Sequence, residues 1–310
     1  MTSPIQISVV ICSYNRCQSL VALLRSLWSH PSLPTAAWDV LVVDNNSADG
    51  TRKAVESLIE DGFTNLNYVF EGRQGKSFAL NTGVKESKGK ILAFTDDDCI
   101  VGCNWLPAIL KEFEADPDLE GIGGRVELYD TTAPIAHRTY RQRTIILRPD
   151  QAVSMIIGCN MAFRRSVFNL VGGFDPGLGP GSEFGAVFED IDFLYRVYKA
   201  KLKILYSPDV LVHHNHRRST GTQVEKARKG YLIGRGAFYC KHILACDRDV
   251  LKFAYWQTAS LFGSLVGDVL KRKPMIDQRK ALWALFLGAT YQFTRSVSPS
   301  RHIRARRMSK

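Results

Sequence analysis

The chain has 310 residues, of which 45% are apolar and 23% charged, a globular composition that excludes a disordered chain. Seven cysteines, an odd number without a CxxC pair, argue against a disulfide framework or a structural zinc site and predict a reducing, cytoplasmic setting. The net charge of +11 belongs to the C-terminal third, because residues 216–310 hold 20 Lys or Arg against 5 Asp or Glu. That surplus predicts a negatively charged partner, either an anionic membrane surface or a nucleic acid.

Strand and helix patterns alternate in the N-terminal third. Continuous apolar runs predict four strands, over residues 7–12, 39–44, 66–70 and 91–94. Apolar residues at helical spacing predict helices between these strands: one after an N-cap at Ser19, one over 51–59 and one over 77–85. Such an alternation is typical of a Rossmann-like α/β fold, with a mostly parallel central sheet and flanking helices.

The pattern becomes less regular further along the chain. It predicts a strand over 121–128, a segment at 158–165 that leads into a helix, a Gly- and Pro-rich loop over 172–185, an amphipathic helix over 188–200, and a strand, turn and strand over 203–216. After residue 216 only helical patterns follow. The expected organisation is therefore an α/β domain over residues 1–216 and a basic, amphipathic helical region over 217–310.

Three polar clusters directly follow predicted strands: Ser13–Arg16, Asp44–Ser47 and Asp96–Asp98. The carboxyl ends of parallel strands meet at one edge of a sheet, where ligands of such folds bind. We therefore expect the clusters to share one ligand. The three consecutive carboxylates would repel one another, so they predict a divalent cation, with a solvated acidic turn as the alternative.

The helix predicted over 188–200 carries Glu189 and Asp190 in its first turn, where the helix dipole favours ionised carboxylates. These side chains are placed to act as bases or ligands, or simply to complement the dipole. Asp192 faces elsewhere and could equally lie on the surface.

Three histidines end the last predicted strand. Because strand residues alternate, His214 and His216 share one face and His213 takes the other. A lone histidine is more often structural, but beside a bound metal one of the three becomes a candidate ligand.

Together these motifs resemble the inverting GT-A glycosyltransferases of family 2. The matching segments stand in the family's order and spacing over about residues 5–215: VVICSYNR, VVDNNSADGT, RQGKSFALNTGVKESKGKILAFTDDD, GCNMAFRRSVFNLVGGFD and FEDIDFLYRVY. The resemblance implies a GT-A fold that binds a nucleotide-diphosphate sugar, with a UDP-sugar as the expected donor, and a Mg2+ or Mn2+ cofactor.

The resemblance also implies roles for donor-binding residues. Ser13 and Asp44 correspond to contacts with the base and ribose of the donor. Arg73, Lys76 and Asn81 match the segment that closes over the nucleotide.

The metal and the chemistry are assigned in the same way. Asp96 and Asp98 correspond to the DXD pair, with Asp98 as the direct metal ligand, Asp96 nearer the ribose or sugar, Asp97 as a spacer beside the nucleotide, and His214 as a further candidate ligand. Asp190 matches the catalytic base, with Glu189 beside it. Cys99 stands where the family commonly has an acidic residue, and Lys201 where a glycine is frequent.

The implied reaction is a single displacement, in which a base takes the proton of an acceptor hydroxyl and the configuration at the anomeric carbon inverts.

The basic region holds helical patterns over 252–273 and 279–296, with Tyr255, Trp256, Trp283 and Tyr291 beside Lys and Arg. These helices either pack on the α/β domain or lie in a membrane interface.

We expect interfacial binding, with the tail over 301–310 as an electrostatic anchor. The N-terminal segment lacks the features of a secretory leader, so the expected location is the cytoplasmic face of the membrane, bound peripherally. The acceptor would then be a lipid-linked or polysaccharide glycan.

A different class stays open: a non-catalytic protein that uses a transferase-like scaffold to bind nucleic acid or membrane. The intact set of Asp96, Asp98 and Asp190 argues against it, and we do not expect nucleic acid as a partner.

Overall fold

The computed structural model describes residues 5–29, 33, 37–130, 139–216, 221–252, 254–255 and 276–297. Its internal contacts divide the chain into two compact units. The sheet unit comprises Met1–Pro176 and Asp190–Thr220, and the helical unit comprises Gly177–Glu189 and Gly221–Lys310. The loop before Asp190 therefore belongs to the helical unit, although the sheet unit surrounds it in the sequence.

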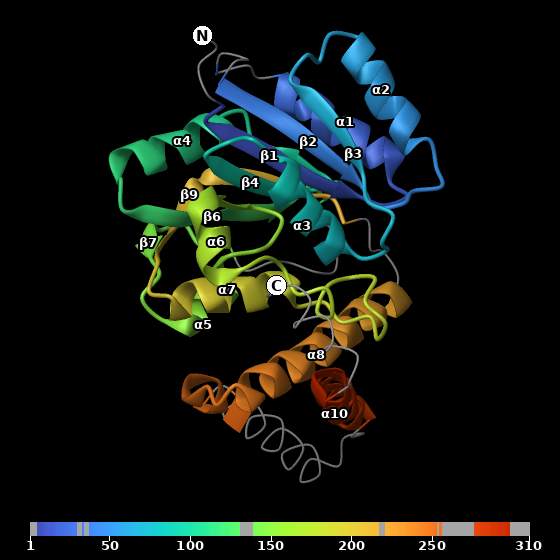
Figure 1. The fold of residues 1–310 in the computed structure, drawn as a ribbon, viewed down its shortest axis with the longest axis vertical. Helices are drawn as coiled ribbons and strands as arrows, with labels where there is room; N and C mark the ends of the chain where they lie inside the picture. The colour runs from blue at the N-terminus through green and yellow to red at the C-terminus, as the bar shows by residue number, and fades with distance from the viewer. Residues whose placement is uncertain are drawn as a thin grey trace, which may run out of the picture. The chain divides into compact units, whose positions relative to one another are not determined.

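One sheet contains all nine strands of the described chain, in the order β3-β2-β1-β4-β8-β6-β9-β5, with β7 paired to β9 (Figure 1). Their bounds are β1 Ile7–Ser13, β2 Trp38–Asp44, β3 Leu66–Phe70, β4 Ile91–Asp96, β5 Cys99–Val101, β6 Leu119–Leu128, β7 Thr144–Ile145, β8 Met161–Arg164 and β9 Lys203–His214. The sheet unit also holds α1 Cys17–Trp28, α2 Thr51–Glu60, α3 Lys76–Glu86, α4 Trp105–Ala115, α5 Pro149–Met155 and α6 Arg165–Val171, and α7 Glu189–Lys199 from its second residue onward.

The α/β fold class is confirmed, with a sheet that is parallel in its first half and mixed beyond it. β1 pairs in parallel with β2 and β4, and β2 with β3. β8 runs antiparallel to both β4 and β6. β8 has only four residues, Met161–Arg164, which is too short an apolar run to be predicted as a strand. Its antiparallel direction depends on the path of the chain and is not encoded in the local sequence.

Helices cover both faces of the sheet. On one face, Val9 and Ile11 of β1 pack in a core with Leu20 of α1 and residues of α2 and α4. On the other face, Val10 packs in a second core with Phe193 of α7 and residues of α3, α5 and α6. The alternation of β1 side chains between the two cores explains why residues 9–12 are apolar in succession.

The first helix begins earlier than the sequence predicts. Ser19 is not its N-cap; α1 starts at Cys17, and Arg16 occupies the cap position without a side-chain cap bond. The Cys17 amide instead donates to Asp49 Oδ2 at 2.9 Å. The Asp49 side chain, 32 residues away in the sequence, thus satisfies an amide at the start of α1. The local sequence therefore predicted the wrong N-cap residue.

The predicted turn between two C-terminal strands is also wrong, because β9 runs unbroken from Lys203 to His214. Its pairing with β6 shifts register where Gly124 faces Ser207 and Arg125 faces Leu211. The residues between Ser207 and Leu211, which look like a turn in the sequence, form a bulge within the continuous strand β9.

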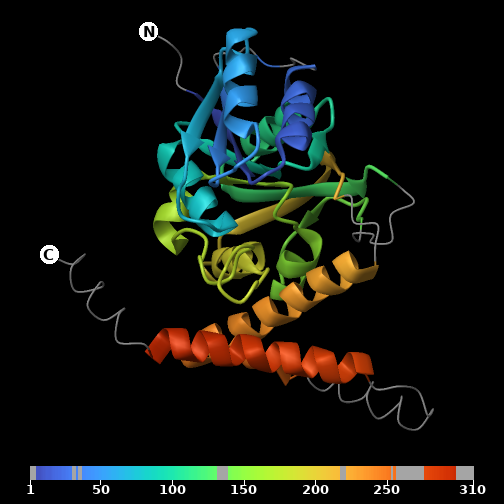
Figure 2. The same cartoon turned by 90° about the vertical axis from the view of Figure 1, so that its right-hand side faces the viewer.

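In the helical unit, α8 (Gly221–Leu244) and α10 (Ile276–Val297) pack side by side, and Figure 2 shows them in orange and red. A Cβ at Gly236 would meet the backbone of Leu285, and one at Gly288 would meet that of Ile233, so only glycine permits this approach of the two helices. The predicted helix over 252–273 lies largely outside the described residues, as do Trp256 and the tail over 301–310. Among the helices that are described, none has the length and apolar character needed to cross a bilayer.

The loop of the helical unit rests on α8. The Val187 amide donates to the Gly230 carbonyl at 3.2 Å, and the ring of Phe188 lies 5.4 Å from that of Phe238. A Cβ added at Gly234 would lie 2.7 Å from Phe188 Cβ and 2.9 Å from the Val187 nitrogen. The loop before α7 therefore depends on α8 for its conformation.

Candidate active site

The strand register brings the three polar clusters to one edge of the sheet, as predicted. Ser13 lies opposite Asp44, and Cys12 lies opposite Asp96. The Ser13 hydroxyl donates to Asp97 Oδ2 at 2.8 Å. Residues from the ends of β1, β2 and β4 therefore form a single site.

Each carboxylate of the acid triplet, Asp96–Asp98, has a cationic neighbour. Lys76 Nζ lies 2.6 Å from Asp96 Oδ1. Arg16 Nη1 lies 3.1 Å from Asp97 Oδ1 and contacts Asp98 Oδ2. The solvated acidic turn is excluded, because Asp97 and Asp98 are 5% and 8% exposed.

The three carboxylates differ in their proton affinity. Burial raises the pKa of Asp97 to about 6, although the charge of Arg16 opposes the shift. Burial also disfavours ionised Asp98, but His214, Arg16 and Lys76 outweigh it and hold the pKa of that carboxyl well below its usual range. Asp98 is thus the carboxylate of the pair that stays ionised and can hold a cation.

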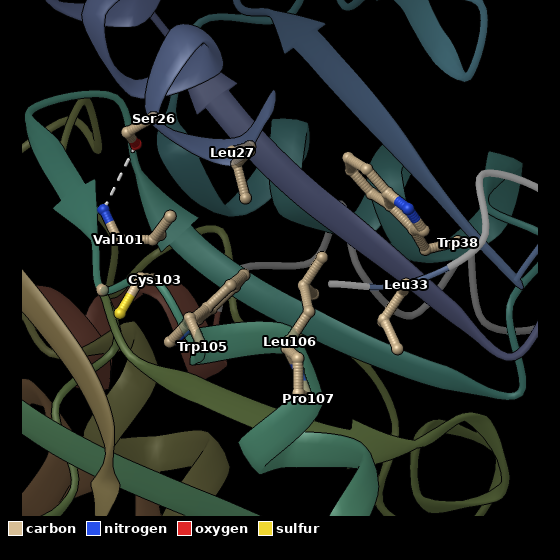
Figure 3. A pocket seen from close by; sticks show the side chains of 10 residues that line it. Ser26, Leu27, Leu33, Trp38, Val101, Cys103, Trp105, Leu106 and Pro107 are labelled. Carbon is tan, nitrogen blue, oxygen red and sulfur yellow. Dashed lines mark hydrogen bonds between the residues drawn. The ribbon is translucent and has the colours of Figure 1, made fainter. Parts of the chain in front are cut away.

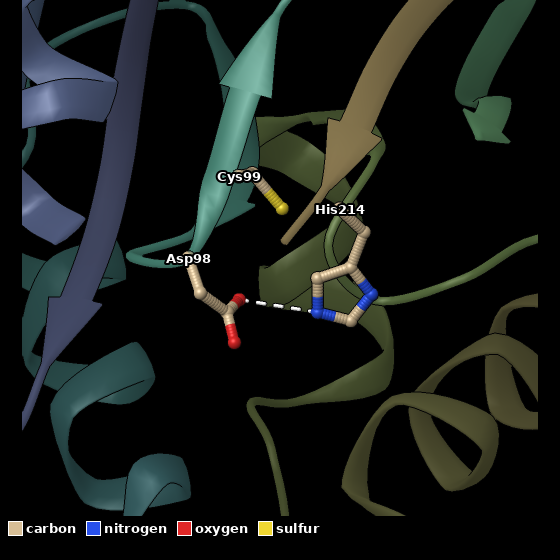
Figure 4. Close-up of side chains that lie close together, drawn as sticks. All are labelled: Asp98, Cys99 and His214. Carbon is tan, nitrogen blue, oxygen red and sulfur yellow. Dashed lines mark ion pairs between the residues drawn. The ribbon is translucent and has the colours of Figure 1, made fainter. Parts of the chain in front are cut away.

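The donor set around Asp98 fits a divalent cation. One ligand atom each from Asp98, Cys99 and His214 lie within 4.8 Å of one another (Figure 4). His214 Nε2 is 3.1 Å from Asp98 Oδ1, which is buried. Asp96 is outside this group and pairs with Lys76 instead.

Asp190 stands in the first turn of α7. Its Oδ2 accepts the Gly158 amide at 3.0 Å, and its Oδ1 accepts the Ile191 amide at 2.8 Å. Burial raises the pKa of Asp190; the charge of Lys76 opposes that shift and the charge of Asp96 adds to it. Asp190 therefore lies within electrostatic reach of the acid triplet. Glu189, one residue earlier, is buried and belongs to the helical unit.

A carboxylate of raised pKa beside a cluster that can hold a cation at a strand-end edge is the arrangement of a group-transfer site. The model of glycosyl transferase family 2 matches residues 8–172, more than half of the chain. The chain belongs to glycosyl transferase family 2. It is a glycosyltransferase, as the sequence motifs predict.

Curated relatives of this transferase include the glycosyltransferase AglE of Haloferax volcanii, 28% identical over 76% of this chain and 74% of that protein. The succinoglycan biosynthesis protein ExoM of Rhizobium meliloti is 29% identical over 67% of this chain and 66% of that protein. The pre-mycofactocin glycosyltransferase of Mycobacterium tuberculosis is 29% identical over 69% of this chain, which spans about half, 51%, of its length.

Solved structures share the fold of this transferase. The mannosyltransferase PcManGT of Pyrobaculum calidifontis, in complex with GDP-Man and Mn2+, matches with a TM-score of 0.61 at 18% identity, over 94% of this chain and 89% of that one. TarS of S. aureus in complex with UDP-GlcNAc matches with a TM-score of 0.60 at 16% identity, over 76% and 66%. Both comparisons confirm the GT-A architecture.

Asp44 of the transferase is held from two sides. The Tyr68 hydroxyl donates to its Oδ2 at 2.8 Å, and the Ser47 amide donates to its Oδ1 at 2.9 Å. The carboxylate is 2% exposed, so a ligand would reach it only at the remaining lone pairs.

The loop between β3 and α3 carries two of the predicted donor contacts. Arg73 pairs with Glu71 at 2.7 Å, and its guanidinium also stacks over Phe78. Asn45 belongs to the predicted Asp44–Ser47 cluster but was given no role of its own; it accepts the Gly75 amide at 2.8 Å and donates to the Arg73 carbonyl at 2.7 Å. The loop is therefore tied to the end of β2.

Asn81 is used inside the fold. Its amide nitrogen donates to the Phe174 carbonyl at 2.8 Å, and its oxygen accepts the Phe174 amide at 2.7 Å. These contacts hold the segment after α6, and they do not join Asn81 to the acid triplet.

The histidines lie as strand alternation predicts. The rings of His214 and His216 are 5.6 Å apart, whereas His213 Nε2 faces Glu127 at 3.8 Å. Asp192 is not a surface residue, because it is fully buried and pairs with Arg196 at 2.9 Å. Arg16 belongs to the predicted Ser13–Arg16 cluster, but the sequence analysis gave it no role as a counter-ion of the acid triplet.

A small cavity lies apart from this chemistry, between α1, β2 and the start of α4 (Figure 3). Leu27, Trp38 and Leu106 line it, and the Ser26 hydroxyl accepts the Val101 amide at its rim. Its lining contains no acid or histidine, and it includes none of the residues of the predicted site.

Proposed function

We propose that the protein is a metal-dependent inverting glycosyltransferase that moves a sugar from a UDP-sugar to a hydroxyl of its acceptor. The observation that carries this proposal is the position of Lys76. Its ammonium group lies 2.6 Å from Asp96, its charge helps to keep Asp98 ionised, and it opposes the burial that raises the pKa of Asp190. The proposed base and the proposed cation cluster therefore share one electrostatic environment.

In the proposed reaction, Asp190 takes the proton of the acceptor hydroxyl as the oxygen attacks the anomeric carbon. The Gly158 amide and the α7 N-terminus hold that carboxylate in place. Attack from the face opposite the diphosphate is a single displacement, and it inverts the anomeric configuration.

Asp98 and His214 would hold a Mg2+ or Mn2+ ion, which when bound stabilises the charge of the diphosphate leaving group. Lys76 faces Asp96 and Arg16 faces Asp97 and Asp98, and both cations are placed to pair with the phosphates of a donor. Asp96 then lies next to the ribose or sugar.

The remaining donor contacts are proposed from their place at the sheet edge. Ser13 and Asp44 would meet the ribose and base, and Arg73 would close over the nucleotide from its tied loop. Asp97 acts as a buried spacer that fixes Ser13. Asn81 would act indirectly, by holding the segment at Phe174, and Glu189 would support the base from the preceding residue.

We further propose that residues 1–216 supply catalysis and that the basic region over 217–310 binds the cytoplasmic face of an anionic membrane. Trp283, Phe286 and Phe293 lie on one face of α10 and are 60%, 59% and 50% exposed. A helix with such a face beside a basic tail is typical of interfacial binding. Tyr255 is also exposed, but Tyr291 is buried against Phe184 and takes no part in that face. A lipid-linked or polysaccharide glycan is the acceptor that fits this location.

The test is calorimetric titration of UDP, GDP and dTDP into the purified protein, with Mn2+ and with EDTA. We expect one nucleotide to bind with Mn2+, and we expect EDTA or Asp98→Ala to abolish binding. An Asp118→Ala variant, which changes a carboxylate between α4 and β6, controls for the loss of one charge. If no nucleotide binds under any condition, the active-transferase proposal fails.

A further inference from the structure

Cys99 is the first residue of β5 and directly follows Asp98. It is 1% exposed and lies opposite His214 across the antiparallel pairing of β5 with β9. Residues paired in this way project from the same side of a sheet. The thiol therefore extends to the side on which the His214 imidazole lies, as Figure 4 shows.

The three side chains have the spacing of ligands around one ion. The Cys99 sulfur, an Asp98 oxygen and a His214 nitrogen all lie within 4.8 Å of one another. The oxygen and nitrogen of the last two are 3.1 Å apart, close to the roughly 3.4 Å that tetrahedral ligands at about 2.1 Å from a cation would have. Small side-chain adjustments would bring all three atoms onto one cation.

The opposite edge of Asp98 is already in use. Arg16 contacts Oδ2, whereas His214 and the thiol lie toward Oδ1. A cation at Oδ1 can bind without displacing the Arg16 guanidinium. The two positive groups would then occupy different oxygens of one carboxylate.

We propose that Cys99 is a third protein ligand of the divalent cation, beside Asp98 and His214. This inference rests on the proposed metal-dependent function. When the cation binds, a sulfur–metal bond forms, the thiol proton is released to solvent, and no electron is transferred. Because a thiolate and an imidazole are softer than the oxygen ligands that Mg2+ prefers, the site would favour Mn2+, Co2+ or Zn2+ over Mg2+.

A purely structural role for Cys99 is the competing explanation. Its side chain belongs to the core that contains Trp105 and Ile122, and Cys159 is a second buried thiol nearby. A packing cysteine predicts no sulfur–metal signal. A ligand at Cys159 instead predicts a signal that survives replacement of Cys99.

The test uses the full-length protein, stripped of metal and titrated with Co2+ alone. We expect a thiolate-to-cobalt charge-transfer band in the near ultraviolet, lost in Cys99→Ser and in Cys99→Ala and retained in Cys159→Ala and in Cys103→Ala. Cys103 is an exposed cysteine in the loop after β5, so it is a matched control for loss of one thiol. Circular dichroism checks that each variant is folded.

Calorimetry with each metal alone separates this inference from the proposed function. We expect Cys99→Ser to weaken Co2+ binding by at least the roughly 10-fold that loss of an outer-sphere partner costs, with a smaller effect on Mg2+. If wild type binds Mn2+ in an Asp98-dependent way but shows no thiolate band, the inference is wrong and the proposed function stands. If no divalent metal binds at all, both fail.

Discussion

The Gly158 amide donates to Asp190 Oδ2 at 3.0 Å, and a Cβ on Gly158 would lie 2.7 Å from that same oxygen. The loop between α5 and β8 thus holds the proposed base by a contact that only glycine allows. Gly158→Ala should displace the carboxylate without removing any catalytic group. Since a misplacement of about 1 Å can cost about 100-fold in rate, we expect turnover to fall by about that factor with nucleotide affinity unchanged.

Steady-state kinetics and calorimetry check this prediction. Gly50→Ala is the matched control, because its added Cβ would meet only Cys17 Sγ, at an ordinary 3.9 Å. Equal rates for the Gly158 and Gly50 variants would show that the contact does not position the base.

Replacing the proposed base should separate activity from stability. Asp190→Asn removes the proton acceptor, so we expect turnover to fall by about 100- to 10,000-fold. Because burial raises the pKa of Asp190, ionisation costs the folded state free energy once the pH exceeds the ordinary carboxyl value. The variant should therefore be at least as stable as wild type at about pH 8, with an advantage that shrinks toward about pH 4. Urea unfolding at the two pH values measures this, and an advantage that grows on acidification would contradict it.

The pH dependence of turnover should report the same group. The base must be ionised to act, so activity is lost as the pH falls through the pKa of Asp190. With that pKa raised by burial, the acid limb should lie above the ordinary aspartate value of about 3.9. A rate–pH profile at saturating donor measures the limb. A midpoint at or below the ordinary value would show that Asp190 is not the titrating base.

Lys201 adopts a left-handed backbone conformation, with φ of 58°, just beyond the end of α7. Glycine adopts that conformation without the cost that a Cβ adds, so Lys201→Gly should stabilise the protein by up to about 1 kcal/mol. Lys199→Gly, two residues earlier and still helical, should instead destabilise it by about 1 kcal/mol. Denaturant unfolding of the pair checks the opposite signs, and a loss of stability in both variants would refute the conformational argument.

Membrane binding should depend on the exposed face of α10. Trp283→Glu replaces an apolar surface worth about 2 kcal/mol by a charge, so we expect binding to anionic vesicles to weaken by about tenfold or more. Leu170→Glu places the same charge on an exposed leucine of α6 and should leave binding unchanged. Co-sedimentation at low salt makes the comparison. Two variants that bind as wild type does would exclude this face of α10 as the contact.

The central strands were predictable because a strand buried on both faces carries its signal locally. β1, β2 and β4 are largely apolar and buried, and the common edge of β1 to β4 follows from their common direction. The placement of Ser13, Asp44 and Asp98 at one site could therefore be deduced before any coordinates.

What could not be deduced depends on partners distant in sequence. The start of α1 is set by Asp49, and the continuity of β9 is set by a bulge against β6. Arg16 lies beside the acid triplet because β1 pairs with β4, and this pairing is not visible in the sequence around Arg16. The carboxylates, Lys76 and His214 were singled out from the sequence, but the pairing of Arg16 with Asp97 and Asp98 was not.

The chain leaves the helical unit between Glu189 and Asp190, one peptide bond before the proposed base. The preceding loop is fixed on α8 by Gly230 and by the pairing of Phe188 with Phe238. A fragment that ends at residue 216 would keep this loop and lose the surface that shapes it. The C-terminal region is therefore not a detachable module, and chimaeras between relatives should exchange the loop and the helices together.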